Sequence, residues 1–224
     1  MNINSDHGES AGFDEEILAC IDSANVCCGV HAGSATETMA IVRRCHELGV
    51  EVGAHPGFDD RENFGRVDVE LSPRDLGDLV RFQVAAIAAL GPIGYIKAHG
   101  ALYHHCQDHA DAADELAKVA HEFGTALMGQ PGFEIIAACR RHGVRSLSEG
   151  FADRRYLPDG KLAPRTQAGA VLPPAQAAEQ AIKFAREGRF DTICLHGDSP
   201  GAVETARNIR QALTEAGITT GALA

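Results

Sequence analysis

Four histidines stand directly after short apolar runs of the sequence, where strands of a folded chain would end. They are His31, His55, His99 and His196, and each has a glycine or a proline within two residues. Imidazole changes its charge near neutral pH and is the commonest side-chain ligand for metal ions. A neighbouring glycine lets a ligand approach the backbone closely. These four residues therefore indicate a catalytic or metal-binding site built from several segments of the chain.

Carboxylates and cations follow the same apolar runs. The set consists of Asp6, Glu9, Lys97, Glu149, Asp153, Arg154 and Asp198. Together with the histidines, they place an ionisable group at the end of six of the seven runs. A random scatter of ionisable residues would not favour one end of the runs. We therefore expect these side chains to meet in one site.

Two kinds of chemistry suit these residue types. In the first, Asp6, His31 and His55 bind a divalent metal ion, with an open position for a hydrolytic reaction. No compact metal motif, such as His-Glu-x-x-His, accompanies this set. In the second, carboxylate and imidazole groups act as acid and base without a metal, and Lys97 or Arg154 stabilises a developing negative charge. The residues alone leave both open.

Other polar segments have simpler interpretations beside the functional ones. Residues 59–66 form a charged loop in which Arg61 and Arg66 either grip an anion or face solvent. His46, His121 and His142 fall late in predicted helices, where an imidazolium complements the helix dipole. Residues 104–109 read as a solvated loop and the start of a helix.

The elements that must position these groups alternate along the chain. Short apolar segments predict buried parallel strands at residues 2–5, 24–28, 50–54, 94–98, 125–128, 144–147 and 192–195. Capping residues, prolines and glycines predict helices at 14–21, 35–48, 73–90, 108–123, 132–142, 174–187 and from Ser199-Pro200 to 216. This alternation predicts a parallel α/β fold, either a closed barrel or an open doubly wound sheet. In both, the active site lies at the carboxyl ends of the strands.

Composition narrows the function classes. The chain has 224 residues, of which 45% are hydrophobic, and a net charge of −11. We expect one domain over residues 1–224, with no nucleic-acid partner, because an acidic chain repels phosphate backbones. The apolar runs are too short to span a membrane, and the first residues do not resemble a signal peptide. Seven cysteines predict free thiols and a cytoplasmic location. Neither a P-loop nor a G-x-G-x-x-G dinucleotide motif is present.

The sequence resembles the LamB/YcsF family in seven blocks that keep the same order along the chain. The blocks are residues 4–9 (NSDHGE), 23–33 (SANVCCGVHAG), 53–58 (GAHPGF), 60–66 (DRENFGR), 97–103 (KAHGALY), 151–156 (FADRRY) with 164–165 (PR), and 194–198 (CLHGD). The sequence departs from the usual family residues at His7, Ser34, Ala98 and His104, which border the predicted site.

The resemblance implies a seven-stranded (β/α) barrel similar to the glycoside hydrolase/deacetylase superfamily. It also implies ATP-dependent hydrolysis of the lactam of 5-oxo-L-proline (pyroglutamate) to L-glutamate, together with separate 5-oxoprolinase B and C subunits. ATP would be used through the complex, a divalent metal is possible, and so is a homo-oligomer. The lactam is a stable amide, and phosphorylation of its oxygen would make a better electrophile for water.

Residue roles are assigned within this expected reaction. Catalysis is expected from Asp6, His55, Lys97, His99, His196 and Asp198, with His55 or His99 as the general base. Substrate binding is expected from Glu9, Asn25, Arg61, Arg66, Asp153 and Arg154, and metal binding from Asp6, His31 and His55. Two alternatives stay open. One is a metal-dependent amidohydrolase or deacetylase that needs no ATP, and the other is a non-catalytic subunit that binds a lactam or a sugar.

Overall fold

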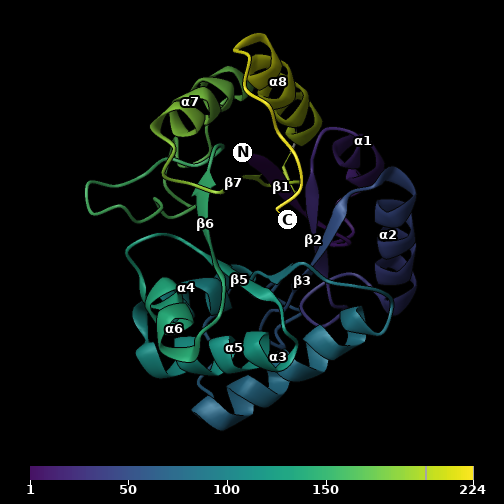
Figure 1. Ribbon diagram of the computed structural model, residues 1–224, viewed down its shortest axis with the longest axis vertical. Coiled ribbons are helices and arrows are strands. Elements are labelled where there is room, and N and C mark those ends of the chain that lie inside the picture. The colour runs from purple at the N-terminus through teal and green to yellow at the C-terminus, as the bar shows by residue number, and fades with distance from the viewer. Residues whose placement is uncertain (200, 224) are drawn as a thin grey trace.

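Seven parallel strands close into a barrel in the computed structural model, which describes residues 1–199 and 201–223 (Figure 1). The strands are β1 (Asn2–His7), β2 (Ser23–Cys27), β3 (Glu51–His55), β4 (Tyr95–Ile96), β5 (Ala126–Gly129), β6 (Ser146–Phe151) and β7 (Thr192–Leu195). They pair in chain order, and β7 pairs with β1 to complete the ring. Of the two predicted architectures, the closed barrel is therefore confirmed, and the open sheet is wrong.

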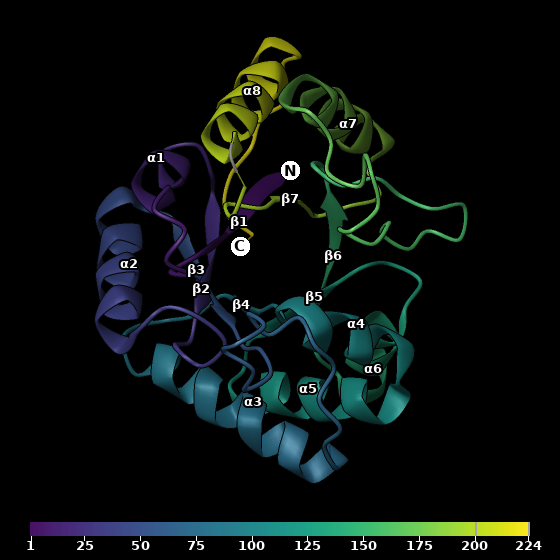
Figure 2. The same ribbon diagram turned by 180° about the vertical axis from the view of Figure 1, so that it is seen from behind.

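Helices surround the barrel on its outer side (Figures 1 and 2). They are α1 (Asp14–Leu18), α2 (Ala35–Leu48), α3 (Pro73–Ala88), α4 (Gly100–Asp108), α5 (Ala110–Glu122), α6 (Glu134–His142), α7 (Pro174–Glu187) and α8 (Ala202–Glu215). The predicted start and stop signals operate as expected at α2, where Ser34 accepts a hydrogen bond from the Glu37 amide and Gly49 adopts a left-handed conformation. The predicted start of the last helix includes Pro200, which lies outside the described residues.

Two elements differ from the sequence-based predictions. Helix α4 occupies residues for which the sequence predicts a loop. Its start carries no recognisable signal, because the N-cap residue is His99, whose side chain makes no capping hydrogen bond. Strand β4 has only two residues, although the amides of Lys97 and His99 still donate to the carbonyls of Ala54 and Pro56 beyond its end. Long loops follow β3 and β6, and residues of both line the cavity at the carboxyl end of the barrel. No helix in the described ranges is long and apolar enough to cross a membrane.

The interior of the barrel is polar, although the strands were predicted as continuously apolar. The side chain of Asn25 donates hydrogen bonds to Asn4 (2.8 Å) and Asp6 (2.7 Å), and its own oxygen accepts one from Tyr95 (2.7 Å). Asn4 in turn donates to Thr192 across the β1–β7 seam at 2.7 Å. Inward-facing residues of β1, β2, β4 and β7 therefore form a hydrogen-bonded polar network inside the barrel, while the residues between them face the helices.

The C-terminal segment closes the amino-terminal end of the barrel. The amide of Gly221 donates to the carbonyl of Met1 at 3.0 Å, and the amide of Leu223 donates to the Glu51 carboxylate at 2.8 Å. The side chain of Leu223 packs with Tyr95 and Met128 in a small apolar cluster inside this end. Ligands must therefore reach the polar interior from the carboxyl end.

Candidate active site

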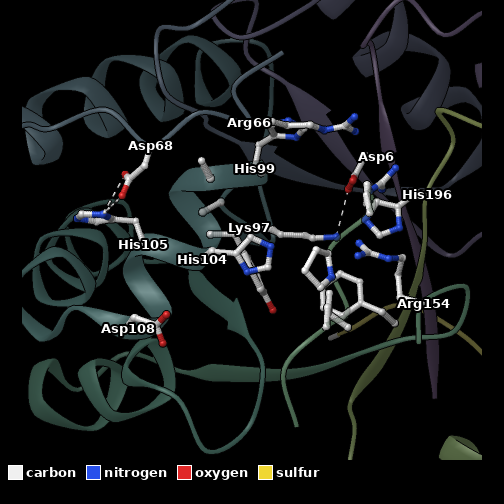
Figure 3. Close-up of a pocket in the computed structure, with 18 of the residues that line it drawn as sticks. Asp6, Arg66, Asp68, Lys97, His99, His104, His105, Asp108, Arg154 and His196 are labelled. Atoms are coloured by element: carbon white, nitrogen blue, oxygen red, sulfur yellow. Dashed lines mark hydrogen bonds and ion pairs between the residues drawn. The ribbon is translucent and has the colours of Figure 1, made fainter. Parts of the chain in front are cut away.

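A cavity of about 550 Å³ opens at the carboxyl ends of the strands (Figure 3). The predicted site residues that line it include Asp6, His55, Lys97, His99, Arg154 and His196. They come from strands β1, β3, β4, β6 and β7 or from the loops that follow them directly. The structure thus brings together residues that are up to 190 positions apart in the sequence.

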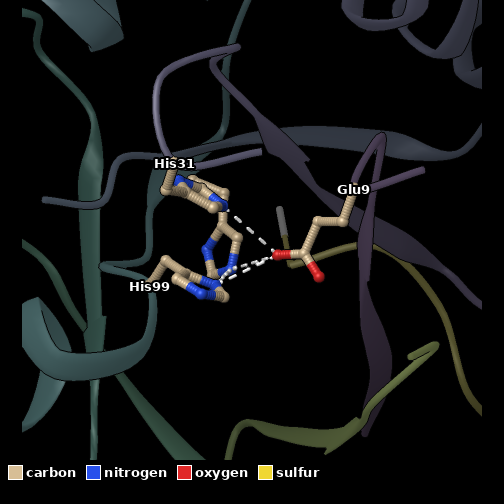
Figure 4. A group of neighbouring side chains, drawn as sticks. Glu9, His31 and His99 are labelled. Carbon is tan, nitrogen blue, oxygen red and sulfur yellow. Dashed lines mark hydrogen bonds and ion pairs between the residues drawn. The ribbon is translucent and has the colours of Figure 1, made fainter. Parts of the chain in front are cut away.

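Four buried side chains form a compact cluster at one side of this cavity (Figure 4). Oε1 of Glu9 lies 3.0 Å from Nδ1 of His99, 3.3 Å from Nε2 of His31 and 3.7 Å from Nε2 of His55. Nδ1 of His99 is also 3.0 Å from Nε2 of His55. These four atoms all lie within 4.8 Å of one another, a spacing that suits one metal ion.

The outer nitrogens of two of these rings assign the protons. Nδ1 of His55 lies 2.8 Å from the carbonyl of Lys97, and Nε2 of His99 lies 2.9 Å from the carbonyl of Phe64. A carbonyl oxygen only accepts, so both outer nitrogens carry hydrogen. In the neutral rings, Nε2 of His55 and Nδ1 of His99 then each carry a lone pair in place of a hydrogen. These two nitrogens face each other and Glu9. A cation or an extra proton is needed between them, and this donor set fits a divalent metal.

Glycines in the loop after β3 make room for this cluster. A Cβ atom on Gly57 would lie 2.6 Å from Nδ1 of His31, and one on Gly65 would lie 2.9 Å from Cβ of His31. Gly65 also has a positive φ of 63°. The rings of His31 and His99 are stacked, with centroids 4.0 Å apart. The loop packs against them because glycine stands at these two positions, where a larger residue would clash with His31.

Burial and hydrogen bonding set the charge state of the cluster. Burial alone would raise the pKa of Glu9, but its interactions with the imidazoles of His31 and His99 outweigh burial and lower that pKa strongly. Burial lowers the pKa of His31 to about 4, and the hydrogen bond to Glu9 only partly opposes it. At neutral pH, Glu9 is thus an anion and His31 a neutral imidazole, which are the forms that bind metal ions.

Lys97 forms the floor of the cavity. Its Nζ lies 2.8 Å from Glu149, 3.1 Å from Asp6 and 3.0 Å from Sγ of Cys194, and the side chain is 3% exposed. Burial by itself lowers the pKa of Lys97, but the carboxylates outweigh it and keep the pKa well above the ordinary value. Burial likewise raises the pKa of Asp6, yet Lys97 and His55 bring it well below normal. The floor is therefore an ion-paired network.

Asp153 and His196 form a hydrogen-bonded pair, and His196 lines the cavity. The carboxylate of Asp153 accepts from Nδ1 of His196 and from the His196 amide, each at 3.0 Å for Oδ2. Because a carboxylate only accepts, Nδ1 carries hydrogen. Burial raises the pKa of Asp153, but His196 more than offsets this and the pKa is lowered. A carboxylate that orients an imidazole in this way is typical of a general base.

The ionised form of Asp153 should make stability depend on pH. Because its pKa is lower in the folded than in the unfolded chain, its contribution is complete above about pH 4 and is lost as the pH falls further. We expect Asp153→Asn to lower the free energy of unfolding at pH 7 by about 1–3 kcal/mol. Urea unfolding at pH 7 and pH 3 should show this difference narrowing in acid.

The exposed Asp59→Asn serves as the control for this measurement and should leave stability nearly unchanged at both pH values. A difference between wild type and Asp153→Asn that widens in acid would contradict the assignment of a low pKa to Asp153.

The metal set of Asp6, His31 and His55 stays a prediction. In the structure, Asp6 is held by Lys97 and Asn25, while Glu9 and His99 lie with the two histidines in one cluster. Asp6 is 3.5 Å from Nε2 of His55 and so borders the cluster.

Two predicted substrate-binding residues lie away from the cavity lining. Arg61 donates to the carbonyls of Gly29, Gly33 and Ala32 and so clamps the loop after β2. Asn25 is buried in the polar interior of the barrel. Both residues make hydrogen bonds within the protein, and their contact with substrate stays a prediction.

Asp198 lies at the mouth of the cavity, where it pairs with Arg66 and with Arg165. Glu149 lies within β6 and not after it, as the predicted strand 144–147 implied, and neither Glu149 nor Arg165 carries a predicted role. The burial of Glu149 in the barrel depends on pairing across the closed sheet. The Pro164-Arg165 block was visible in the sequence, but no periodicity linked it to a strand end.

Comparisons with known proteins show the family of the chain. A model of the LamB/YcsF family matches residues 1–224. The chain is 40% identical over 242 residues to a protein of Nocardia farcinica (strain IFM 10152) that is named as the A subunit of 5-oxoprolinase, with 97% of each chain covered.

Two solved structures are also similar. The lactam utilization protein from Thermus thermophilus has a TM-score of 0.92 at 36% identity, with 99% of each chain covered. The family 4 carbohydrate esterase from Streptomyces lividans has a TM-score of 0.61 at 12% identity, over 100% of this chain and 92% of the esterase. This second likeness extends to the barrel fold alone.

Proposed function

Because the chain belongs to the LamB/YcsF family, we propose that it is the A subunit of a 5-oxoprolinase and that its barrel opens the lactam ring of 5-oxo-L-proline. The observation that carries this proposal is the cluster of Glu9, His31, His55 and His99, which borders a cavity large enough for a small cyclic amide. The similar proteins, one named for 5-oxoprolinase and one for lactam utilization, point to the same substrate class.

The proposed reaction needs coupling to ATP because a lactam is a stable amide. Transfer of the γ-phosphoryl group of ATP to the lactam oxygen would leave ADP and an activated ring carbon. Water then attacks this carbon, the ring C–N bond breaks and its nitrogen takes up a proton, which leaves an acyl phosphate of glutamate. A second water hydrolyses this acyl phosphate to glutamate and inorganic phosphate. The chain lacks a P-loop, so we propose that ATP is used through the complex with the B and C subunits.

His196 is well placed to move the protons of this reaction. Its Nδ1 is held by Asp153, and its ring lines the cavity. Nε2 of His196 would accept the proton of the attacking water and return it to the ring nitrogen as the C–N bond breaks. This assignment differs from the predicted general bases His55 and His99, whose inner nitrogens are directed at Glu9 instead.

Glu9, His31, His55 and His99 would hold a divalent ion in this proposal. Such an ion would polarise the carbonyl and lower the pKa of a bound water. The outer hydrogen bonds of His55 and His99 to backbone carbonyls fix the two rings in the form needed for binding.

Metal binding can be measured without any activity. After chelator treatment, we expect the chain to bind about one Zn²⁺ per molecule by calorimetry and elemental analysis, with a rise in the unfolding temperature. His31→Ala should weaken zinc binding by about 100-fold or more. Loss of a residue that only hydrogen-bonds to a metal ligand already lowers metal affinity by about 10- to 100-fold, and His31 is itself an assigned ligand. His121→Ala, in helix α5, is the matched control and should bind like wild type. Equal affinity of both variants would contradict the assigned ligands.

The proposed function is tested by a coupled assay. Release of glutamate from 5-oxo-L-proline should require ATP, this chain and the B and C subunits together. Omission of this chain should abolish the release while leaving the other subunits folded. Glutamate release that is the same with and without this chain would overturn the proposal.

The four-residue cluster also favours a second candidate, a metal-dependent amidohydrolase that works without ATP. That enzyme would hydrolyse an amide with the isolated chain, would lose activity to a chelator and would regain it with added metal. Binding of a lactam without turnover, even with ATP and all partners present, would instead support a carrier role.

A further inference from the structure

The wall of the cavity is rich in guanidinium groups. Arg66, Arg154 and Arg165 all line the cavity. They come from the loop after β3 and from the long loop after β6. Figure 3 shows Arg154 extending into the pocket beside His196, with Arg66 above.

Arg154 is the buried member of this group. It is 5% exposed, and its guanidinium donates to the carbonyl of Ala163 at 2.6 Å and more weakly to that of Ala170 at 3.4 Å. No carboxylate of the described residues lies within 4.0 Å of it, although buried arginines are usually paired. Burial and the neighbouring Arg165 lower the pKa of Arg154, yet its group stays charged at neutral pH.

Arg165 brings a second positive charge close to the first. Its Nη1 donates to the two oxygens of Asp198 at 3.1 and 3.0 Å, and Asp198 is shared with Arg66. The other nearby carboxylate, Asp153, is occupied by His196. Three guanidinium groups therefore face two carboxylates, and the wall keeps an excess of positive charge towards the cavity.

We propose that Arg154 and Arg165 form an oxyanion subsite that binds the negatively charged group of the substrate and turns its amide carbon towards the His/Glu cluster. The proposal rests on the proposed function, in which the substrate has a carboxylate and, once activated, a phosphoryl group. Both are planar or tetrahedral oxyanions that a guanidinium fork recognises. Asp198 acts as a positioning residue that holds Arg165 at the mouth.

Calorimetry on the intact chain tests the subsite with three probes: 5-oxo-L-proline, 2-pyrrolidinone, which is the same lactam without the carboxylate, and inorganic phosphate. We expect wild type to bind 5-oxo-L-proline at least about 10-fold more tightly than 2-pyrrolidinone. Arg165→Met should weaken binding of 5-oxo-L-proline by about 10- to 100-fold, the effect of losing a charge-assisted hydrogen bond. Its affinity for 2-pyrrolidinone should not change.

Controls separate binding from folding. Arg43→Met replaces an exposed arginine of helix α2 and should bind all probes like wild type. Arg154→Lys keeps the charge but loses the fork, so we expect an intermediate loss. If either arginine variant fails to fold, the affinities of the wild-type chain for the two lactams still test the subsite. Equal affinities for the two lactams would overturn it.

The three probes also identify which oxyanion is bound. Loss of phosphate binding alone in Arg165→Met would assign the subsite to the phosphoryl group, whereas loss of 5-oxo-L-proline binding assigns it to the carboxylate. Phosphate binding that depends on Arg165, with no binding of either lactam, would support the subsite and contradict the lactam function. Unchanged affinities for every probe in both arginine variants would overturn the subsite.

Discussion

Replacing His99 by alanine is expected to lower lactam hydrolysis in the reconstituted complex by about 100-fold or more, the scale of a lost acid, base or metal-orienting group. The reason lies in the central position of this ring. His99 contacts Glu9 and His55 at 3.0 Å each and stacks on His31, so its removal disturbs every member of the cluster. The rate is measured as ATP-dependent glutamate release at saturating substrate.

His121→Ala is the matched control, because this histidine lies in the last turn of α5 and outside the cavity. It should retain the wild-type rate. Thermal unfolding of both variants shows whether the chains are folded. A folded His99→Ala variant whose rate stays within about threefold of wild type would remove His99 from the site, since catalytic groups contribute far more than that.

Replacing Lys97 by methionine should destabilise the protein by about 3–5 kcal/mol, the cost of leaving a buried charge without its partner. Methionine has a similar length, so packing changes little. Asp6 and Glu149 would then lose the cation that lies 3.1 and 2.8 Å from them, in a place where their side chains are 7% and 0% exposed. Urea unfolding at pH 7 measures the loss.

Acid should reduce this loss. Without Lys97 the two carboxylates favour their protonated forms, so the difference from wild type should shrink as the pH falls from 7 to 4. Lys97→Met combined with Glu149→Gln should recover part of the stability at pH 7. The exposed Lys118→Met, which removes a surface ion pair, should cost at most about 1 kcal/mol. A loss for Lys97→Met no larger than that of the surface variant would contradict the buried ion-pair network.

Much of the fold could be predicted because its signals are local. Helix α2 has its predicted bounds, since a serine cap and a terminal glycine act within one turn of the chain. Strand β7 also has its predicted bounds. Helix α4 was missed because it begins at His99 without a capping side chain, and β6 extends to Phe151 because the neighbouring strand β7 supplies its partners. Such pairing involves residues far away in the sequence.

The candidate site, like the fold, could be predicted only in part from the sequence. The alternation of strands and helices could be predicted from local patterns of residues. From this alternation it followed that His31, His55, His99 and His196 gather at one end of the sheet, because the ends of parallel strands share an edge.

Which of these groups touch one another depends on the folded barrel. In the closed barrel, Glu9 lies among three imidazoles and Asp6 pairs with Lys97. His196 pairs with Asp153, and Arg61 donates hydrogen bonds to backbone carbonyls. These contacts depend on distances of a few ångströms between segments that are far apart along the chain. They are set by strand register, barrel closure and loop packing, which no local pattern of residues encodes.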